Sequence, residues 1–284
     1  MSRNTLIGVL AGLATVVMWA TWIVSTRFGV GGTLSSYDLG FLRFTVPALL
    51  LFPVAIREWR TISRVHPVRL LLMLYGAGAP FFLLAATGMT FAPASEAGAL
   101  LPGAMPLFVA LLAVVVTRER IAPTRWIGFA LIGAGVLAIL GDALIEGAHD
   151  GRWRGHLFFL AASFSWAIYT LAFRGSGLGV WQGAAVVSVG SAVGYLPIYL
   201  IWLEPGLGRA AFPELSLQIA AQGLASGFFS LLFFSTAVAK LGSSRGAAFG
   251  SLAPILAWIF AVIFLGERLD PTGIAGVLLT SSGV

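Results

Sequence analysis

Two short segments of this sequence are near copies of each other: residues 117–124 read T-R-E-R-I-A-P-T, and residues 266–272 read G-E-R-L-D-P-T. Each follows an apolar stretch that contains a proline, and the match extends outward in a constant register, which chance does not produce. At a displacement of 148 residues the pairs are Gly98/Gly246, Pro106/Pro254, Glu119/Glu267, Arg120/Arg268, Pro123/Pro271, Thr124/Thr272, Gly128/Gly276, Gly135/Gly283 and Val136/Val284, and at 147 they are Trp19/Trp166, Ala20/Ala167, Trp22/Tyr169 and Arg27/Arg174. The sequence therefore predicts two repeats, residues 1–145 and 146–284.

The composition around these repeats excludes a soluble globular protein. Hydrophobic residues make up 58% of the chain and charged residues only 10%, with a mean hydropathy of +0.95, whereas soluble domains carry about 25% charged residues. A membrane-spanning helix needs about 20 apolar residues. We expect an all-α integral membrane protein with ten transmembrane helices, at residues 6–26, 39–56, 70–89, 95–116, 126–140, 156–173, 181–202, 217–239, 247–265 and 271–284.

Five helices in each repeat impose a geometric relation between the repeats. Because five is odd, the second repeat must enter the membrane from the side opposite to the first, so the repeats are inverted. Inverted repeats allow one fold to open alternately to either side of the membrane around a central site. The sequence thus predicts two inverted five-helix repeats around a central cavity.

The basic residues predict the orientation. They concentrate in alternate connections, which by the positive-inside rule face the cytoplasm. With the N-terminus inside, the inner connections hold Arg57, Arg60, Arg64 and Arg69, then Arg118, Arg120 and Arg125. Most acids fall in the opposite connections. We expect a multi-pass protein of the cell inner membrane with both termini cytoplasmic.

Several function classes lack their characteristic residues. There are no cysteines, and His66, His149 and His156 are expected in or beside polar connections, so we expect no metal site, no cofactor and no catalytic residue at membrane depth. No phosphate-binding loop of the G-x-x-x-x-G-K-[ST] type occurs, so no ATP hydrolysis by the chain is expected and no ATPase subunit is implied. The arginines are dispersed, which opposes nucleic-acid binding.

The repeated motifs resemble those of the drug/metabolite transporter superfamily, specifically the EamA type. The resemblance rests on the paired segments at 117–124 and 266–272 and on two openings, M-W-A-T-W at 18–22 and S-W-A-I-Y at 165–169. It covers nearly the whole chain and is especially close to the YddG-type exporters of aromatic amino acids. The resemblance implies a basket of ten helices around a central cavity and export of amino acids or other small metabolites.

Two charged residues are expected near membrane depth. An unpaired Arg43 would cost about 2.5–3.5 kcal/mol at a helix centre, so it faces protein or water, either as a contact for a substrate carboxylate or by snorkelling to the interface. Glu96 could bind a substrate ammonium or a coupling proton, or simply stabilise the start of its helix.

Aromatic residues are the candidate lining of the cavity. Trp19 with Trp22, and Trp166 with Tyr169, share one helical face by their spacing of three. An interfacial aromatic belt is the alternative interpretation. Aromatic walls suit hydrophobic amino acids or lipophilic cations without choosing between them. Further candidates for substrate binding are Tyr75, Phe82, Phe228 and Phe249.

Prolines at matching positions in both halves are candidate hinges. Pro106 and Pro254 meet the expectation that interrupted helices mark transporter sites. The Glu119–Arg120 and Glu267–Arg268 pairs are interpreted as structural features at the hinges that follow.

These observations favour a secondary transporter that binds a small-molecule substrate, most simply an amino acid with an aromatic or hydrophobic side chain, and exports it by alternating access. A multidrug exporter of lipophilic cations is the alternative. An intramembrane enzyme would need a base beside a nucleophile, and a channel would need a filter of repeated polar groups; the sequence shows neither.

Overall fold

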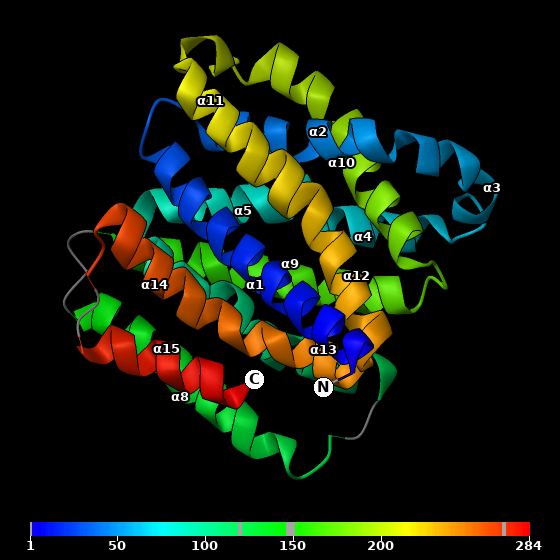
Figure 1. The fold of residues 1–284 in the computed structure, drawn as a ribbon. Coiled ribbons are helices and arrows are strands. Elements are labelled where there is room, and N and C mark those ends of the chain that lie inside the picture. Colours follow the sequence, from blue (N-terminus) through cyan, green and yellow to red (C-terminus); the bar gives the residue numbers. More distant parts are fainter. Residues whose placement is uncertain (1, 119–120, 146–150, 269–270) are drawn as a thin grey trace.

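The computed structural model describes residues 2–118, 121–145, 151–268 and 271–284, and every regular element in these ranges is a helix (Figure 1). The first half comprises α1 (Arg3–Val30), α2 (Ser36–Arg57), α3 (Trp59–Ile62), α4 (Pro67–Ala77), α5 (Ala79–Phe91), α6 (Ala94–Gly98), η1 (Ala99–Gly103), α7 (Met105–Leu112), η2 (Ala113–Thr117) and α8 (Arg125–Ile145). The second half comprises α9 (Arg152–Arg174), α10 (Val180–Trp202), η3 (Leu207–Arg209), α11 (Phe212–Gln218), η4 (Ile219–Phe229), α12 (Ser230–Leu241), α13 (Ser243–Ala248), η5 (Phe249–Leu252), α14 (Ala253–Leu265) and α15 (Pro271–Gly283).

Eight of these helical segments are long and apolar enough to cross a membrane. They are Arg3–Val30, Ser36–Arg57, Pro67–Phe91, Ala94–Val116, Arg125–Ile145, Arg152–Arg174, Val180–Trp202 and Phe212–Leu241. The shorter apolar helix Phe249–Leu265 and the 13-residue α15 occupy the ninth and tenth expected positions. A 13-residue helix is about 20 Å long, less than the roughly 30 Å of bilayer hydrocarbon. The protein is a multi-pass membrane protein, but the described residues do not confirm ten spans.

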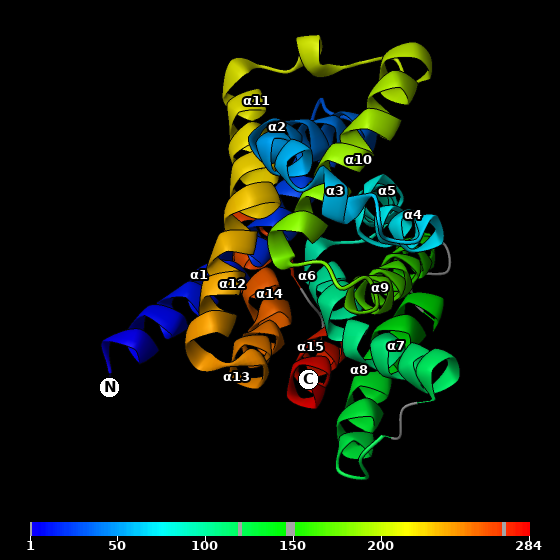
Figure 2. The same ribbon diagram turned by 90° about the vertical axis from the view of Figure 1, so that its right-hand side faces the viewer.

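The helices pair mainly across the two halves of the chain. Extensive contacts join α8 to α15, α2 to α10, α1 to α12, α9 to α4 and α5, and α6 to α14. If each helix in this set is replaced by its counterpart in the other half of the chain, the same set of pairs results. Figures 1 and 2 both place α8 beside α15, far from the layer that holds α2 and α10. The first and second halves are therefore interleaved.

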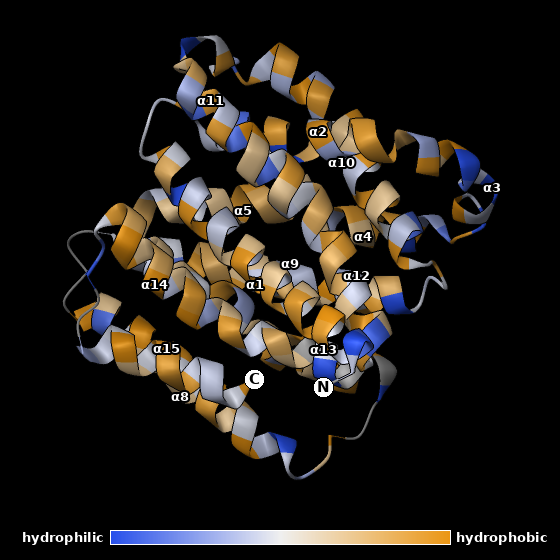
Figure 3. Ribbon diagram, viewed as in Figure 1, coloured by the Kyte–Doolittle hydropathy of each residue, from blue (hydrophilic) through white to orange (hydrophobic). Residues whose placement is uncertain are grey.

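Local sequence features explain where several helices begin and bend. Ser35 caps α2 and forms a capping box with Asp38, which satisfies two backbone N–H groups that the first turn leaves free. Gly78 lies at the break between α4 and α5. Only glycine fits there, because a Cβ would lie 2.2 Å from the Leu74 carbonyl oxygen. Pro80 follows in the first turn of α5. Hydrophilic residues gather at α3 and at the bundle ends, with apolar residues between (Figure 3).

The two predicted proline hinges lie where the helices are irregular. Pro106 is in the first turn of α7, directly after the π-helical turn η1. Pro254 is in the first turn of α14, directly after the 3-10 turn η5. Proline lacks a backbone N–H and suits the first turn of a helix. Both spans are therefore interrupted at matching positions, which is the geometry that the hinge hypothesis requires.

Candidate substrate site

A polar cluster lies inside the bundle where α1, α2 and η4 meet, and it centres on Arg43. The Nη1 atom of Arg43 donates to Oγ of Ser226 at 2.6 Å and to the carbonyl oxygen of Gln222 at 3.3 Å. Its guanidinium carbon lies 5.6 Å from the centre of the Trp22 ring, within the range of a cation–π contact. Arg43 therefore contacts η4 and α1, while part of its own surface stays exposed.

Glycines allow η4 to approach α2 closely enough for these contacts. A Cβ on Gly223 would lie 2.6 Å from Cβ of Val46, and a Cβ on Gly227 would lie 2.7 Å from Cγ of Pro47. Side chains at either position would push the two helices apart. Segment η4 is also π-helical over its length, and π-helical turns occur frequently at functional sites.

Glutamines extend the cluster from η4 to α1. Nε2 of Gln222 donates to Oγ1 of Thr26 at 2.9 Å, and Nε2 of Gln218 donates to the carbonyl oxygen of Ser25 at 2.8 Å. Both glutamines have no exposed surface. Their spacing of four, continued by Ser226, places three polar side chains on one face of an apolar span. That spacing is visible in the sequence, but our sequence analysis did not identify these residues.

Two buried polar atoms on residues that contact Arg43 have no hydrogen-bond partner among the described residues. One is the indole nitrogen Nε1 of Trp22, a donor, and the other is Oε1 of Gln222, an acceptor. Buried polar atoms are nearly always satisfied in native proteins. An unpartnered donor and an unpartnered acceptor on two residues that contact Arg43 make this cluster the strongest candidate for binding a polar ligand. We call Trp22, Arg43, Gln222 and Ser226 the Arg43 site.

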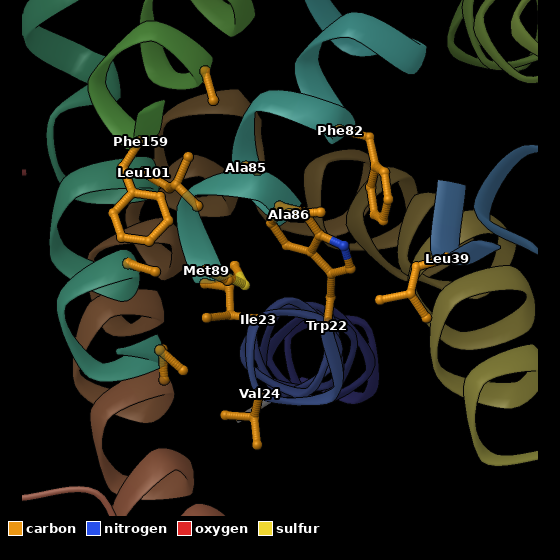
Figure 4. Packing of buried hydrophobic residues seen from close by; sticks show 14 of the residues in the cluster. Trp22, Ile23, Val24, Leu39, Phe82, Ala85, Ala86, Met89, Leu101 and Phe159 are labelled. Atoms are coloured by element: carbon orange, nitrogen blue, oxygen red, sulfur yellow. The ribbon is translucent and has the colours of Figure 1, made fainter. Parts of the chain in front are cut away.

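Aromatic rings surround the Arg43 site, and they include three of the predicted lining residues. The Trp22 ring centre lies 6.0 Å from that of Phe81 and 6.4 Å from that of Phe82, and Phe81 lies 5.0 Å from Trp166. Figure 4 shows the Trp22 side chain extending from α1 toward Phe82 and Ala86. Tyr169 continues the row, 5.3 Å from Trp166. One aromatic cluster therefore joins α1 and α9, the first helix of each half.

The other predicted aromatic residues lie elsewhere. Trp19 packs on Phe234 of α12 at 5.7 Å, and Phe228 lies 6.3 Å from Trp181 of α10. Phe249 packs against α1 at Gly12, where a Cβ would lie 2.6 Å from its ring. Tyr75 is 44% exposed on α4. The structure does not bring these four residues into the cluster around Trp22.

A second polar cluster involves Glu96 and corrects the expectation for His156. His156 lies in the second turn of α9 with no exposed surface, and its Nε2 is 2.5 Å from Oε2 of Glu96. Arg152 lies 3.3 Å from the other carboxylate oxygen of Glu96 and 3.6 Å from Asp142. The sequence placed His156 in or beside a polar connection, as the first residue of the expected helix 156–173; the structure begins α9 at Arg152 and buries the imidazole.

The acid of the second repeated motif joins the two halves. Oε1 and Oε2 of Glu267 accept hydrogen bonds from the backbone nitrogens of Ala94 and Ser95, each at 2.9 Å, at the start of α6. Arg27 lies 3.7 Å from Glu267 and also donates to the carbonyl oxygen of Met89. Arg27 and Glu267 border an open recess of about 290 Å³ between the ends of α1 and α14. Glu119 and Arg120, the first copy of the motif, lie outside the described residues.

Comparison with known proteins assigns the family. Residues 6–141 and 153–284 match the EamA-like transporter family. The chain is 28% identical over 279 residues to a probable terminal-alkyne amino-acid exporter of Streptantibioticus cattleyicolor, covering 95% of this chain and 89% of the relative. It is 24% identical over 262 residues to an S-adenosylmethionine uptake transporter of Rickettsia prowazekii, covering 88% and 82%.

Two further similarities extend over nearly the full length. An uncharacterized transporter of Archaeoglobus fulgidus is 24% identical over 276 residues, covering 95% of this chain and 94% of the relative. The fold also matches a solved crystal structure with a TM-score of 0.65 at 19% sequence identity, covering 99% of this chain and 94% of that one. Because the family match covers both halves of the sequence, this chain belongs to the EamA-like transporter family.

Proposed function

We propose that this transporter exports amino acids with aromatic or apolar side chains by alternating access, and that the Arg43 site binds the backbone groups of the substrate. The observation that carries the proposal is the Arg43 guanidinium, which contacts Trp22 and Gln222, two residues that carry an unpartnered indole N–H and an unpartnered amide oxygen. A carboxylate suits the guanidinium and the Trp22 N–H. An ammonium suits Oε1 of Gln222. This donor and acceptor set matches a zwitterion.

The aromatic cluster favours an apolar side chain on the substrate. Trp22, Phe81 and Trp166 stand next to the charged site and connect α1, α5 and α9. Aromatic side chains bury large areas and prefer tilted or offset ring contacts. A substrate with a polar backbone and an aromatic side chain would therefore contact both parts of the site at once.

The alternative, export of lipophilic cations, has less support. A cation site in a membrane protein needs an acid that is free to attract the ligand. Glu96, the acid predicted for that role, is paired with His156 and Arg152. The acid Glu267 is engaged with the backbone of α6 and with Arg27.

The direction and the architecture are parts of the same proposal. Export is supported by the similarity to the amino-acid exporter, although another relative is named for uptake. The symmetric pairing of helices across the halves supports two inverted repeats, residues 1–145 and 146–284. The excess of arginine in alternate connections supports location in the inner membrane with both termini in the cytoplasm, and it places Glu267 on the outer side.

The test is counterflow of radiolabelled phenylalanine into proteoliposomes loaded with unlabelled phenylalanine. We expect competition by tryptophan and methionine, weaker competition by 3-phenylpropionate, which lacks the ammonium, and none by phenethylamine, which lacks the carboxylate. Arg43→Gln should abolish counterflow, and Arg43→Lys should weaken it because lysine cannot form the bidentate contact. Competition by phenethylamine equal to that by phenylalanine would contradict a carboxylate contact at Arg43.

A further inference from the structure

The buried pair Glu96–His156 is a titratable site that substrate binding at Arg43 does not use. His156 has no exposed surface and Glu96 is only 5% exposed. Nε2 of His156 and Oε2 of Glu96 are 2.5 Å apart. The pair lies between α6 and α9, which come from different halves of the chain.

The hydrogen bonds of His156 indicate which protonation state this conformation accommodates. Nδ1 is buried and has no partner among the residues that the structure describes. A neutral imidazole can donate from Nε2 to the carboxylate and leave Nδ1 as an unused acceptor, whereas a protonated imidazole has a donor on both nitrogens. A buried donor without an acceptor is strongly unfavourable. An added proton on His156 therefore disfavours this conformation and favours one in which Nδ1 reaches water.

The charged neighbours of the pair are few. Arg152 of α9 and Asp142 of α8 lie on one side, and on the other side Glu267 and Arg27 contact the start of α6. The sequences of α5, η1, α7, α14 and α15 contain no charged or titratable side chain. Glu146, His149 and Asp150 belong to a stretch outside the described ranges.

Glu96 lies in α6, and the start of the same helix is also bound by the contacts that hold one end of the bundle together. Glu267 binds the first backbone N–H groups of α6, and Arg27 links α1 both to Glu267 and to the end of α5. A rearrangement that exposes His156 must move α6 or α9 at this end. We propose that Glu96–His156 is a proton-binding site, and that protonation opens the end of the bundle that Glu267 holds together. In transport this site would couple the cycle to a proton gradient, a role that rests on the proposed function.

A single cysteine can report the opening without any substrate, because the chain has none of its own. Met89 is fully buried and its carbonyl oxygen accepts from Arg27. In the detergent-solubilised full chain, Met89→Cys is labelled with a maleimide between about pH 5.5 and about pH 8, the range in which histidine titrates. Gly208→Cys, on the exposed turn η3 with no atom near its Cβ, corrects for the pH dependence of the thiol. We expect the Met89/Gly208 rate ratio to rise several-fold at the lower pH.

Variants assign the effect to the pair. His156→Gln should abolish the pH dependence of the ratio, because it removes the imidazole that takes up the proton. Glu96→Gln, which removes the charged partner of that imidazole, should alter the pH dependence, whereas Ser95→Ala, which changes the neighbouring buried residue without altering a charge, should match the wild type. A flat ratio in the Met89→Cys protein and in a second reporter, Ala92→Cys at a site 1% exposed, overturns the proposal. Persistence of the pH dependence in both glutamine variants overturns it equally.

The transport arm separates this proposal from the amino-acid proposal. Counterflow at equal pH on both sides tests the substrate. Acceleration of phenylalanine transport by an imposed pH gradient tests the coupling, and we expect it in the wild type and not in His156→Gln. If counterflow is absent for every amino acid, the substrate proposal fails, and the labelling experiment alone then decides on the proton site.

Discussion

The carboxylate of Glu267 holds the start of a helix from the other half of the chain, with Oε2 2.9 Å from the backbone nitrogen of Ser95. Together with the bond to Ala94, this contact satisfies two N–H groups that the first turn of α6 would otherwise leave unpaired. The conspicuous acid of the repeated motif thus acts on a distant segment.

Replacing Glu267 should weaken this end of the bundle. Loss of a capping side chain costs about 0.5–2 kcal/mol, so Glu267→Ala is expected to lower the thermal midpoint of the purified protein and to increase labelling of Met89→Cys. Arg268→Ala, an exposed neighbour, is the control and should behave as wild type. Equal effects of the two substitutions would contradict the assigned role of Glu267.

Gln222 should distinguish substrates that carry an ammonium group. In Gln222→Met the proposed acceptor Oε1 is lost, and a hydrogen bond to a charged group contributes about 1.5–3 kcal/mol. The KM for phenylalanine should therefore rise about 10- to 100-fold. The apparent inhibition constant of 3-phenylpropionate should change little, because that ligand has no ammonium. A parallel rise for both ligands would indicate a general disturbance of the cluster.

The close packing of η4 on α2 predicts a strong effect of a single methyl group. Gly223→Ala would place a Cβ 2.6 Å from Val46, and overpacking costs about 1–3 kcal/mol. We expect a lower thermal midpoint and reduced counterflow, since separation of these helices also moves Gln222 away from Arg43. Gly194→Ala in α10, where nothing lies within 4 Å, should leave both quantities unchanged. Unaltered stability of Gly223→Ala would contradict the close contact.

Two tyrosines one turn apart on α10 provide a matched pair for stability. The hydroxyl of Tyr199 donates to the carboxylate of Asp38, and that of Tyr195 donates to the carbonyl oxygen of Tyr37 at 3.0 Å. A bond to a charged group contributes about 1.5–3 kcal/mol and a neutral one about 1 kcal/mol. Tyr199→Phe should therefore lower the free energy of unfolding more than Tyr195→Phe. Denaturant titration of the two variants measures the difference, and the reverse order would contradict it.

The repeated motif and the apolar periodicity were enough to predict a helical membrane protein and its family. Helix boundaries near Ser35 and Gly78 follow local rules of capping and chain flexibility, which act within a few residues. The ninth and tenth spans were not confirmed, since Phe249–Leu265 and α15 are shorter than the eight candidate spans within the described residues. The count of apolar stretches alone did not anticipate that difference.

The polar sites were harder to predict, because they depend on contacts between distant residues. Arg43 was recognised, but its partners on η4 are about 180 positions away and became visible only in the packed structure. His156 was placed at the start of its helix beside a polar connection, but its contact with Glu96, 60 positions away, became visible only in the structure. Of the aromatic candidates, Trp22, Phe82, Trp166 and Tyr169 gather, whereas Trp19, Tyr75, Phe228 and Phe249 do not, because a spacing along one helix does not reveal which neighbour the face meets.

The interleaving of the two halves has a consequence for biosynthesis. When α1 and α2 enter the membrane, their main partners α12 and α10 have not yet been translated. Until then each early helix must be stable in the lipid bilayer without its partner. The length and hydropathy of Arg3–Val30 and Ser36–Arg57 are sufficient for each to span the membrane alone. Assembly of the bundle is thus delayed until the second half of the chain has been inserted. The two halves, produced as separate polypeptides, should therefore associate in the membrane.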